Sequence, residues 1–369
     1  MDETSDISDS AILANVTAFL AQGTESQKKR LCRFLRAQSS YMYSAPDAIL
    51  PAEELAVKLG IIEGLRKNQE ELFFEKSFHF SYIQLATLCL TPTKTLQELL
   101  HPKQFLSSVL FPEHWLNILI RWKHPADSIE DGRRGLAVIS SNSREEREKC
   151  KLRDQRTCIL TKAANPDVCR IMPSSVAKNK AEISAFITPV FLSVLLGRSG
   201  FEIGRILLKG TPNTFEESWN MICLHPLLRM WWSECLFGLK CLGIDSNSEH
   251  STVKIQFHWM PMNSVRPHQI VEPPYDKATN AMLESMASDV QDGYFHGLKS
   301  GQIFEIQHAS EEDAEKMKAA LDVQWVAVRL AALSGAARSW EWGLGNDLYD
   351  DGDDDGPNVY AASDDEDEG

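Results

Sequence analysis

The sequence lacks the features that would place the protein in a membrane or outside the cell. Its longest uncharged apolar stretch runs from Ile183 to Gly197 and contains Pro189. That stretch is too short to cross a bilayer, and it predicts a buried helix or a pair of strands instead. The first ten residues are acidic and polar, without the basic start and apolar run of a secretion signal. We therefore expect an intracellular protein, nuclear or cytoplasmic, that is neither secreted nor membrane-bound.

A paired cysteine motif is also missing. The chain has eight cysteines, and no two of them form a Cys-x-x-Cys pattern. This absence argues against a zinc ribbon and against a dithiol redox centre. The spacings of Cys150, Cys158, Cys169 and Cys223 match no zinc knuckle. We expect reduced thiols that pack as small apolar groups.

Basic residues are absent from the end of the chain. The segment from Glu341 to Gly369 holds 12 acidic residues and no Lys or Arg, so most of the net charge of −14 lies there. Residues 143–180, in contrast, hold ten Lys or Arg and five Asp or Glu. The charge is therefore divided between a basic central segment and an acidic tail, which we expect to be disordered. The tail contains the start of a calcium loop, but Ala362 occupies the position where a bidentate glutamate is needed.

Periodicity and composition predict an α+β protein in six parts. Residues 1–10 are expected to be disordered, 11–125 to form a helical domain, and 126–142 to be a linker. A central domain follows at 143–260. An extension at 261–340 ends in an amphipathic helix, and 341–369 is the disordered tail. The alternating segment 251–261 predicts a strand. The N-terminal helical domain is the expected contact region for a protein partner.

The centre of the chain predicts a hairpin. In "RTCILTKAANPDVCRIMPSS" (156–175), two short runs with strand-like composition flank Asn165-Pro166-Asp167, which supplies turn chemistry. The charged segment before it predicts a helix that begins with a capping box, with Ser143 as the N-cap and Glu146 three positions later. Arg170 lies on the second run, at the position where chemistry is expected.

These central motifs resemble the HNH nuclease domain as it occurs in a large group of fungal proteins. The order and spacing of the pieces carry the resemblance, because no single piece is specific. It covers about 100 residues strongly and the segments that follow more loosely. The matching residues are Cys158, Thr161, Ile171 and Pro173 in the first half, and Asn220, Leu224, Leu228 and Trp232 in the second.

The resemblance implies a β-hairpin with a helix packed across it, which together hold one divalent metal ion. It also implies a histidine that takes a proton from water, an asparagine that holds the loop, and a second histidine that binds the metal. In this sequence those three positions are Arg170, Asn220 and Arg229. Arginine stays protonated, so it cannot act as a general base and has no lone pair for a metal. The usual one-metal mechanism is therefore closed to this chain.

We consequently expect a catalytically degenerate HNH-like protein that binds nucleic-acid phosphate without cleaving it. Arg170 and Arg229 are predicted to clamp phosphate, because guanidinium groups bind it through paired hydrogen bonds. Lys178 and Lys180 are expected to assist, and no cofactor is expected.

Two alternatives stay open. In the first, an active nuclease uses Mg, Mn, Ni or Zn with His225 as a relocated ligand, although Pro226 makes a helix interior there unfavourable. In the second, the protein is an interaction scaffold with no nucleic-acid role. The sequence decides neither the substrate nor the oligomeric state.

Overall fold

The computed structural model describes residues 48–73, 77–100, 141–172, 189–208, 214–247, 249–287 and 298–337, together with Thr17, Ala21, Thr24 and Lys28. The expectations for residues 1–10 and for the acidic tail at 341–369 fall outside this part of the chain. So do Lys178, Lys180 and most of the predicted linker. The described residues form a mixed α and β structure, as the sequence predicts. No helix among them has both the length and the apolar character needed to cross a bilayer.

The described elements as far as residue 208 are mainly helical. They are α4 (Ala52–Phe73), β1 (Phe80–Ser81), α5 (Tyr82–Leu90), α6 (Thr93–Leu99), α10 (Ser141–Arg153), β2 (Asp167–Arg170), α13 (Pro189–Leu196) and α14 (Arg198–Leu208). Helix α13 confirms that part of the long apolar stretch forms a helix.

The described part of the chain from residue 214 onward contains most of the described strands. Its elements are η1 (Thr214–Glu216), η2 (Ser218–Asn220), β3 (Met221–Leu224), α15 (Pro226–Ser233), β4 (Phe237–Ser246), β5 (Ser251–Trp259), β6 (Ile270–Val271), α16 (Asp276–Met282), β7 (Ile303–His308) and α18 (Glu311–Ser334). Strand β5 confirms the strand predicted from the alternating segment.

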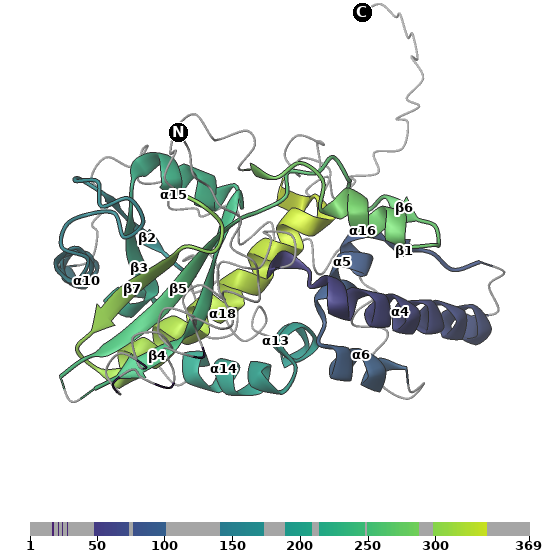
Figure 1. The fold of residues 1–369 in the computed structure, drawn as a ribbon, viewed down its shortest axis with the longest axis horizontal. Helices are drawn as coiled ribbons and strands as arrows, with labels where there is room; N and C mark the ends of the chain where they lie inside the picture. Colours follow the sequence, from purple (N-terminus) through teal and green to yellow (C-terminus); the bar gives the residue numbers. More distant parts are fainter. Residues whose placement is uncertain are drawn as a thin grey trace, which may run out of the picture.

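The largest sheet is three-stranded and antiparallel, in the order β4-β5-β7. Strands β4 and β5 form a hairpin with a register shift between Cys241 and Gly243, where Gly243 has a φ of 139°. Helix α18 runs along this sheet, mainly against β4 (Figure 1). The sheet and the helix form the framework on which the other elements pack.

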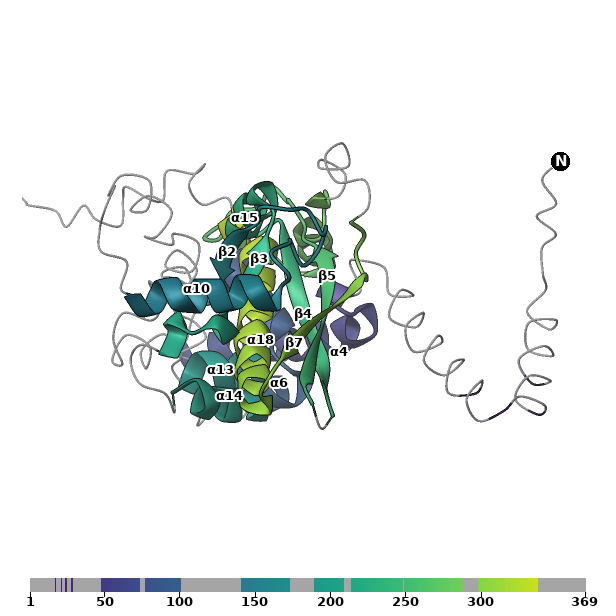
Figure 2. The ribbon, with the colours of Figure 1, turned by 90° about the vertical axis from the view of Figure 1, so that its left-hand side faces the viewer.

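Helix α18 is the central element of the molecule. Its start is fixed by the Ser310 hydroxyl, which accepts a hydrogen bond from the Asp313 backbone N–H, and its end by Gly335 with a φ of 76°. The sequence predicts this helix, and it predicts that one side of the helix is exposed. The second prediction is wrong from Ala319 onward, where nearly every residue is buried. The physical reason is its location, between the sheet on one side and α13 and α14 on the other (Figure 2).

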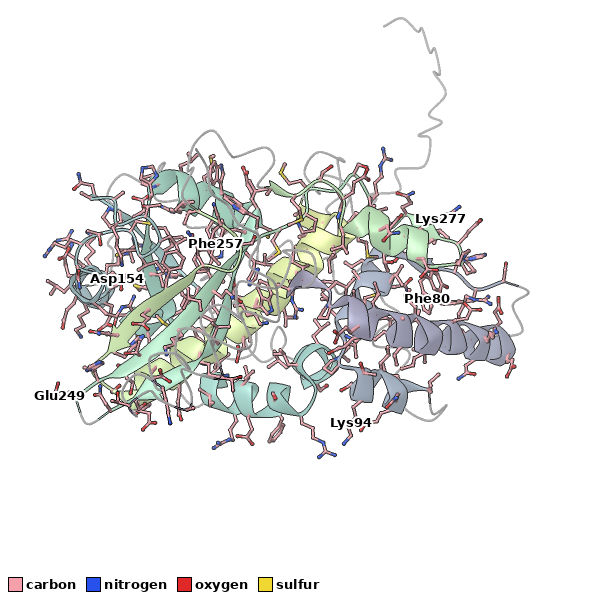
Figure 3. All side chains as sticks on the ribbon, viewed as in Figure 1. Phe80, Lys94, Asp154, Glu249, Phe257 and Lys277 are labelled. Atoms are coloured by element: carbon pink, nitrogen blue, oxygen red, sulfur yellow. The ribbon has the colours of Figure 1, made fainter. Side chains whose placement is uncertain are left out.

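The N-terminal helices share one hydrophobic core with the rest of the chain. Strand β1 pairs with β6, with Phe80 opposite Val271, and α5 packs on α18. Phe80 in this half and Phe257 in the large sheet are both completely buried and belong to the same core (Figure 3). The described part of the predicted helical domain is thus joined to the C-terminal half by packing and by strand pairing.

The predicted hairpin within 156–175 is wrong. Strand β2 pairs with β3, some 50 residues later, and not with the segment just before it. That earlier segment makes only a single bridge, between Thr157 and Ala164, and otherwise folds into a turn in which the Lys162 N–H donates to the Cys158 carbonyl. The reason is burial: β3 is buried along its whole length and supplies apolar side chains to both faces of the pair, while β2 contacts α10 and α15.

The predicted capping box is also wrong. Helix α10 begins at Ser141, so Ser143 lies inside it and is not its N-cap. The Glu146 carboxylate accepts a hydrogen bond from the Ser218 backbone N–H at 2.8 Å, and the Ser143 hydroxyl donates to Glu216 at 3.4 Å. Both side chains thus attach α10 to η1 and η2. A tertiary contact has replaced the local one.

Candidate functional site

Strands β2 and β3 and helix α15 place the residues predicted from the sequence. The strands are antiparallel, with Asp167 opposite Leu224 and Arg170 opposite Met221. Since directly opposed residues point to the same side of a sheet and successive residues alternate, the pair has two distinct faces. Helix α15 begins two residues after β3 ends and contacts β2.

The first face is turned toward α10 and carries Arg170. Its other members, Val168, Met221 and Cys223, form a small buried cluster with Cys150 of α10. The Arg170 guanidinium donates to the Glu216 carboxylate at 2.6 Å, and the exposed fraction of the Arg170 side chain is only 14%. Arg170 therefore makes a short, largely buried ion pair that joins β2 to η1.

The opposite face is turned toward α15, and Arg229 lies on that helix. The Arg229 guanidinium approaches the Asp167 carboxylate at 3.4 Å, and the two side chains are 39% and 40% exposed. Cys169 lies on this face, and burial raises the pKa of its thiol, so it is a poor thiolate ligand. Arg170 thus pairs with Glu216 on one face, and Arg229 pairs with Asp167 on the other. The two arginines do not form a common site.

Asn220, the residue before β3, is polar and has no exposed surface. Its amide oxygen accepts the Met172 backbone N–H at 2.9 Å. Its amide nitrogen donates to the carbonyls of Met172 at 3.0 Å and Phe215 at 2.9 Å. One side chain therefore holds the end of β2 against the segment that leads into β3.

His225 is the N-cap of α15. Its Nδ1 accepts the Leu227 backbone N–H at 3.2 Å, and Pro226 follows at the first helical position. The Nδ1 lone pair is consequently used within the helix start. The side chain that the alternative hypothesis assigns to a metal is here part of the fold.

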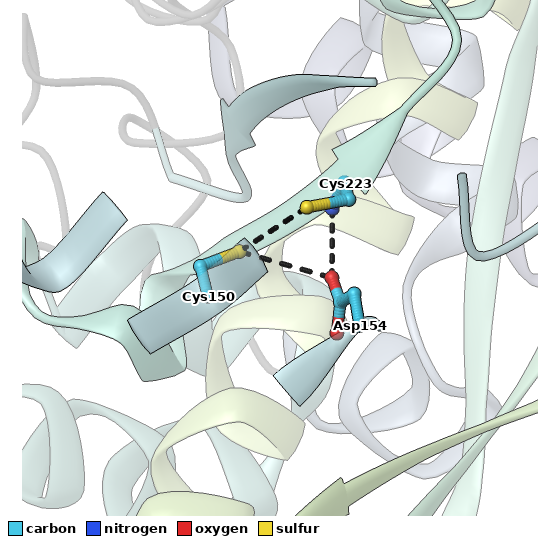
Figure 4. Close-up of side chains that lie close together, drawn as sticks. All are labelled: Cys150, Asp154 and Cys223. Atoms are coloured by element: carbon cyan, nitrogen blue, oxygen red, sulfur yellow. Dashed lines mark hydrogen bonds between the residues drawn. The ribbon is translucent and has the colours of Figure 1, made fainter. Parts of the chain in front are cut away.

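A group that sequence reasoning missed lies between the first face and the end of α10. Cys150 and Asp154 of the α10 end and Cys223 of β3 are all buried, and one potential ligand atom from each lies within 4.8 Å of the others (Figure 4). The two sulfur atoms are 3.9 Å apart, and the Cys150 thiol lies 3.7 Å from the Asp154 carboxylate. Cys150 and Asp154 are four residues apart, one helical turn, which is the only signal the sequence offers.

The polar atoms of this group have hydrogen-bond partners within the protein. The Asp154 carboxylate accepts the Cys223 backbone N–H at 2.8 Å and two hydrogen bonds from Arg153, at 2.8 and 3.1 Å. The Arg153 guanidinium also lies 3.5 Å from the Cys150 sulfur. The contact with Cys223, together with burial, raises the pKa of the Cys150 thiol, which favours a protonated sulfur. Zinc prefers four ligands in a tetrahedral arrangement, with cysteines present as thiolates. This group offers three potential ligand atoms beside a fixed guanidinium charge, so it fits zinc poorly.

Comparison with known proteins gives no family or relative: no family model, no curated protein and no solved structure matches the chain. The side chains of the site are therefore the evidence for function.

Proposed function

We propose that this protein is a non-cleaving HNH-like module that contacts nucleic-acid phosphate through Arg229. The observation that carries the proposal is the different state of the two arginines. Arg170 is held by Glu216 in a largely buried ion pair, whereas the Arg229 side chain is 39% exposed and only loosely paired with Asp167. The pairing of β2 with β3 and the contact of α15 with β2 support the HNH-like assignment, although α13 and α14 lie between the two strands in the sequence.

The described residues support the absence of cleavage. Neither arginine can accept a proton or bind a metal ion. The Nδ1 of His225 accepts a hydrogen bond at the start of α15, and the Cys169 thiol on the same face is buried. The proposed module therefore keeps a structural asparagine, Asn220, around positions that have lost their catalytic groups.

Contact through Arg229 alone replaces the clamp of two arginines expected from the sequence. An exposed ion pair is worth about 0–1 kcal/mol, so a phosphate group can displace Asp167 from Arg229 at little cost. Arg170 would first have to break a short, poorly exposed pair with Glu216 and would face α10. Arg170 thus has a structural role in this proposal, while Lys178 and Lys180 remain predicted phosphate contacts.

The first experiment measures binding of the full chain to labelled duplex DNA and RNA over a series of salt concentrations. Arg229→Gln should weaken binding about tenfold and reduce the slope of log K against log salt by about 1, because one phosphate contact is lost. Arg205→Gln is a matched control, since Arg205 on α14 is also exposed and paired, with Glu202 at 2.9 Å. Arg170→Gln should lower stability while leaving the salt slope unchanged.

The second experiment assays cleavage with Mg, Mn, Ni and Zn. The wild-type chain should not cut with any of them. Cleavage that His225→Ala abolishes would establish the active-nuclease alternative and overturn our proposal. Absence of any salt-dependent binding, combined with protein partners recovered even after nuclease treatment, would instead favour the scaffold.

A further inference from the structure

A second group of polar residues surrounds Trp325 of α18, away from β2 and α15. The Trp325 ring packs on Gly238 of β4, where an added Cβ would lie 3.0 Å from the ring carbons. The His258 ring of β5 lies 5.3 Å from the Trp325 ring, and the Arg329 guanidinium carbon lies 5.0 Å from it. Lys240 is two residues after Gly238 and therefore on the same side of β4. We call Lys240, His258, Trp325 and Arg329 the Trp325 cluster.

The two cations of the cluster have no carboxylate partner among the described residues. Arg329 donates to the Ile49 backbone carbonyl at 3.3 Å and lies over the Trp325 ring. Glu54 offsets part of its charge, but that carboxylate is ion-paired with Lys58 at 3.2 Å. For Lys240 the described structure shows neither a hydrogen bond nor an ion pair. Both residues are partly buried and keep part of their surface exposed.

Two buried nitrogen atoms of the cluster also lack a partner within the described structure. They are Nδ1 of His258 and Nε of Arg329. The His258 residue is only 1% exposed, and its Nε2 lies 2.9 Å from the Gln256 amide oxygen. The orientation of that amide is fixed, because its nitrogen donates to the Gly301 carbonyl at 3.1 Å. Nε2 therefore carries the proton, and Nδ1 is the unused atom.

The electrostatics of the cluster show uncompensated positive charge. Burial and the charge of Arg329 lower the pKa of Lys240. Burial, Lys240 and Arg329 lower the pKa of His258 to about 4, which means that the imidazole lies within the field of both cations. Burial lowers the pKa of Arg329 to about 10. Cations withdrawn from water without a counter-charge are costly, and proteins ordinarily pair them.

We propose that the Trp325 cluster is a binding site for an oxyanion, a phosphate or carboxylate group held between Lys240 and Arg329. The guanidinium has an unused Nε–H beside Nη2, the pair of donors that binds two oxygens of one oxyanion, while Nη1 donates to the Ile49 carbonyl. Lys240 adds a compact second charge. An oxyanion also favours the doubly protonated form of His258, whose Nδ1 then becomes a donor.

Such a group has two sources. One is a free small molecule that carries phosphate or carboxylate. The other is the chain's own acidic tail, whose 12 carboxylates follow closely after α18 in the sequence. The chemistry at the cluster is the same for both, so the experiment has one arm for each source.

The test is calorimetric titration of the full chain with inorganic phosphate and with citrate, at an ionic strength held constant with sodium chloride. One arm uses the wild-type sequence, and the other uses a full chain in which the 12 tail acids are replaced by their amides. In each arm Lys240→Met is compared with Lys277→Met, a lysine exposed on α16 (Figure 3). We expect saturable binding that Lys240→Met weakens at least about tenfold and that Lys277→Met leaves unchanged.

Thermal unfolding serves as the second readout. Without added anion, Lys240→Met should be at least as stable as the wild type, because it removes an unpaired cation, and phosphate should no longer raise its melting temperature. Binding in the wild type identifies a free ligand, and binding only after neutralisation of the tail identifies the tail as the occupant. The proposal is overturned if neither arm binds, or if Lys240→Met binds as tightly as the wild type.

Discussion

The role of Asn220 could be predicted from the sequence, whereas some contacts of the residues around it could not. The resemblance to HNH nucleases assigns the asparagine to holding a loop, and in the structure its side chain bonds both backbone groups of Met172 and the Phe215 carbonyl. The position of Arg170 on a strand could also be predicted. Its ion pair with Glu216 could not be predicted, because that contact depends on how β2 and η1 pack.

Replacement of Asn220 by alanine should therefore be strongly destabilising. The change leaves three buried backbone groups without their partner, and we expect a loss of about 3 kcal/mol in the free energy of unfolding. Urea denaturation followed by circular dichroism measures it. Asn280→Ala, at an exposed position of α16, is the control and should cost less than about 0.5 kcal/mol. Equal losses in the two variants would contradict the role of Asn220.

At the scale of elements, the sequence predicts the strand containing Arg170 but gives it the wrong partner. A turn signal at Asn165-Pro166-Asp167 favours a local hairpin, yet the native partner is β3. Local turn chemistry can be read within a few residues, whereas the choice of β3 depends on side chains of α10 and α15 that are far apart in sequence. The same limit hid the group of Cys150, Asp154 and Cys223, because Cys150 lies on α10, Asp154 directly follows that helix, and Cys223 lies on β3.

The attachment of α10 to β3 gives a prediction at this scale. Arg153 is nearly buried and binds the Asp154 carboxylate and the backbone carbonyls of Ser218 and Met221. Asp154→Asn removes the counter-charge from this arginine and leaves one acceptor oxygen where the carboxylate has two, which serve Arg153 and the Cys223 N–H. We expect it to cost about 3–5 kcal/mol of stability, the usual result of breaking a buried pair.

Glu148→Gln is the matched control for Asp154→Asn. Glu148 pairs with Arg156 at 3.0 Å on the surface of the same helix, so its loss should cost less than about 1 kcal/mol. Urea denaturation of both variants makes the comparison. The wild type should also keep its midpoint after treatment with a strong chelator, because hydrogen bonds hold the group together. A midpoint that falls on chelation would show that a metal ion contributes instead.

At the scale of the whole molecule, one helix connects parts that the sequence treats as separate. Helix α18 packs on the large sheet, on α5, on α14 and on η2. The sequence predicts α18 from its periodicity, but the apolar residues spread around the whole helix cannot say which elements will cover each side. Because one core includes residues from Ile49 to Ala337, we expect the described parts to unfold together.

Two histidines within this framework make the stability of the whole fold depend on pH. His258 is buried on β5 beside Trp325, and His308 is buried on β7 with Nε2 lying 3.2 Å from the Met317 sulfur. Burial and the charge of Arg153 lower the pKa of His308 to about 3. Burial, together with the charges of Lys240 and Arg329, lowers the pKa of His258 to about 4. Both rings are thus neutral in the folded protein at pH values where they are charged in the unfolded chain.

The sign of the pH effect follows from these lowered values. Above the ordinary histidine pKa of about 6.5, neither state binds the proton and stability is at its full value. As the pH falls below 6.5, the unfolded chain gains protons that the folded protein refuses, so each histidine removes about 2 kcal/mol of stability between pH 7.5 and 5. His308→Leu should lessen this loss by about that amount, as measured by urea denaturation at pH 7.5 and at pH 5 without phosphate or citrate. If the variant and the wild type lose the same stability over this interval, His308 is not held neutral by the packing of β7 against α18.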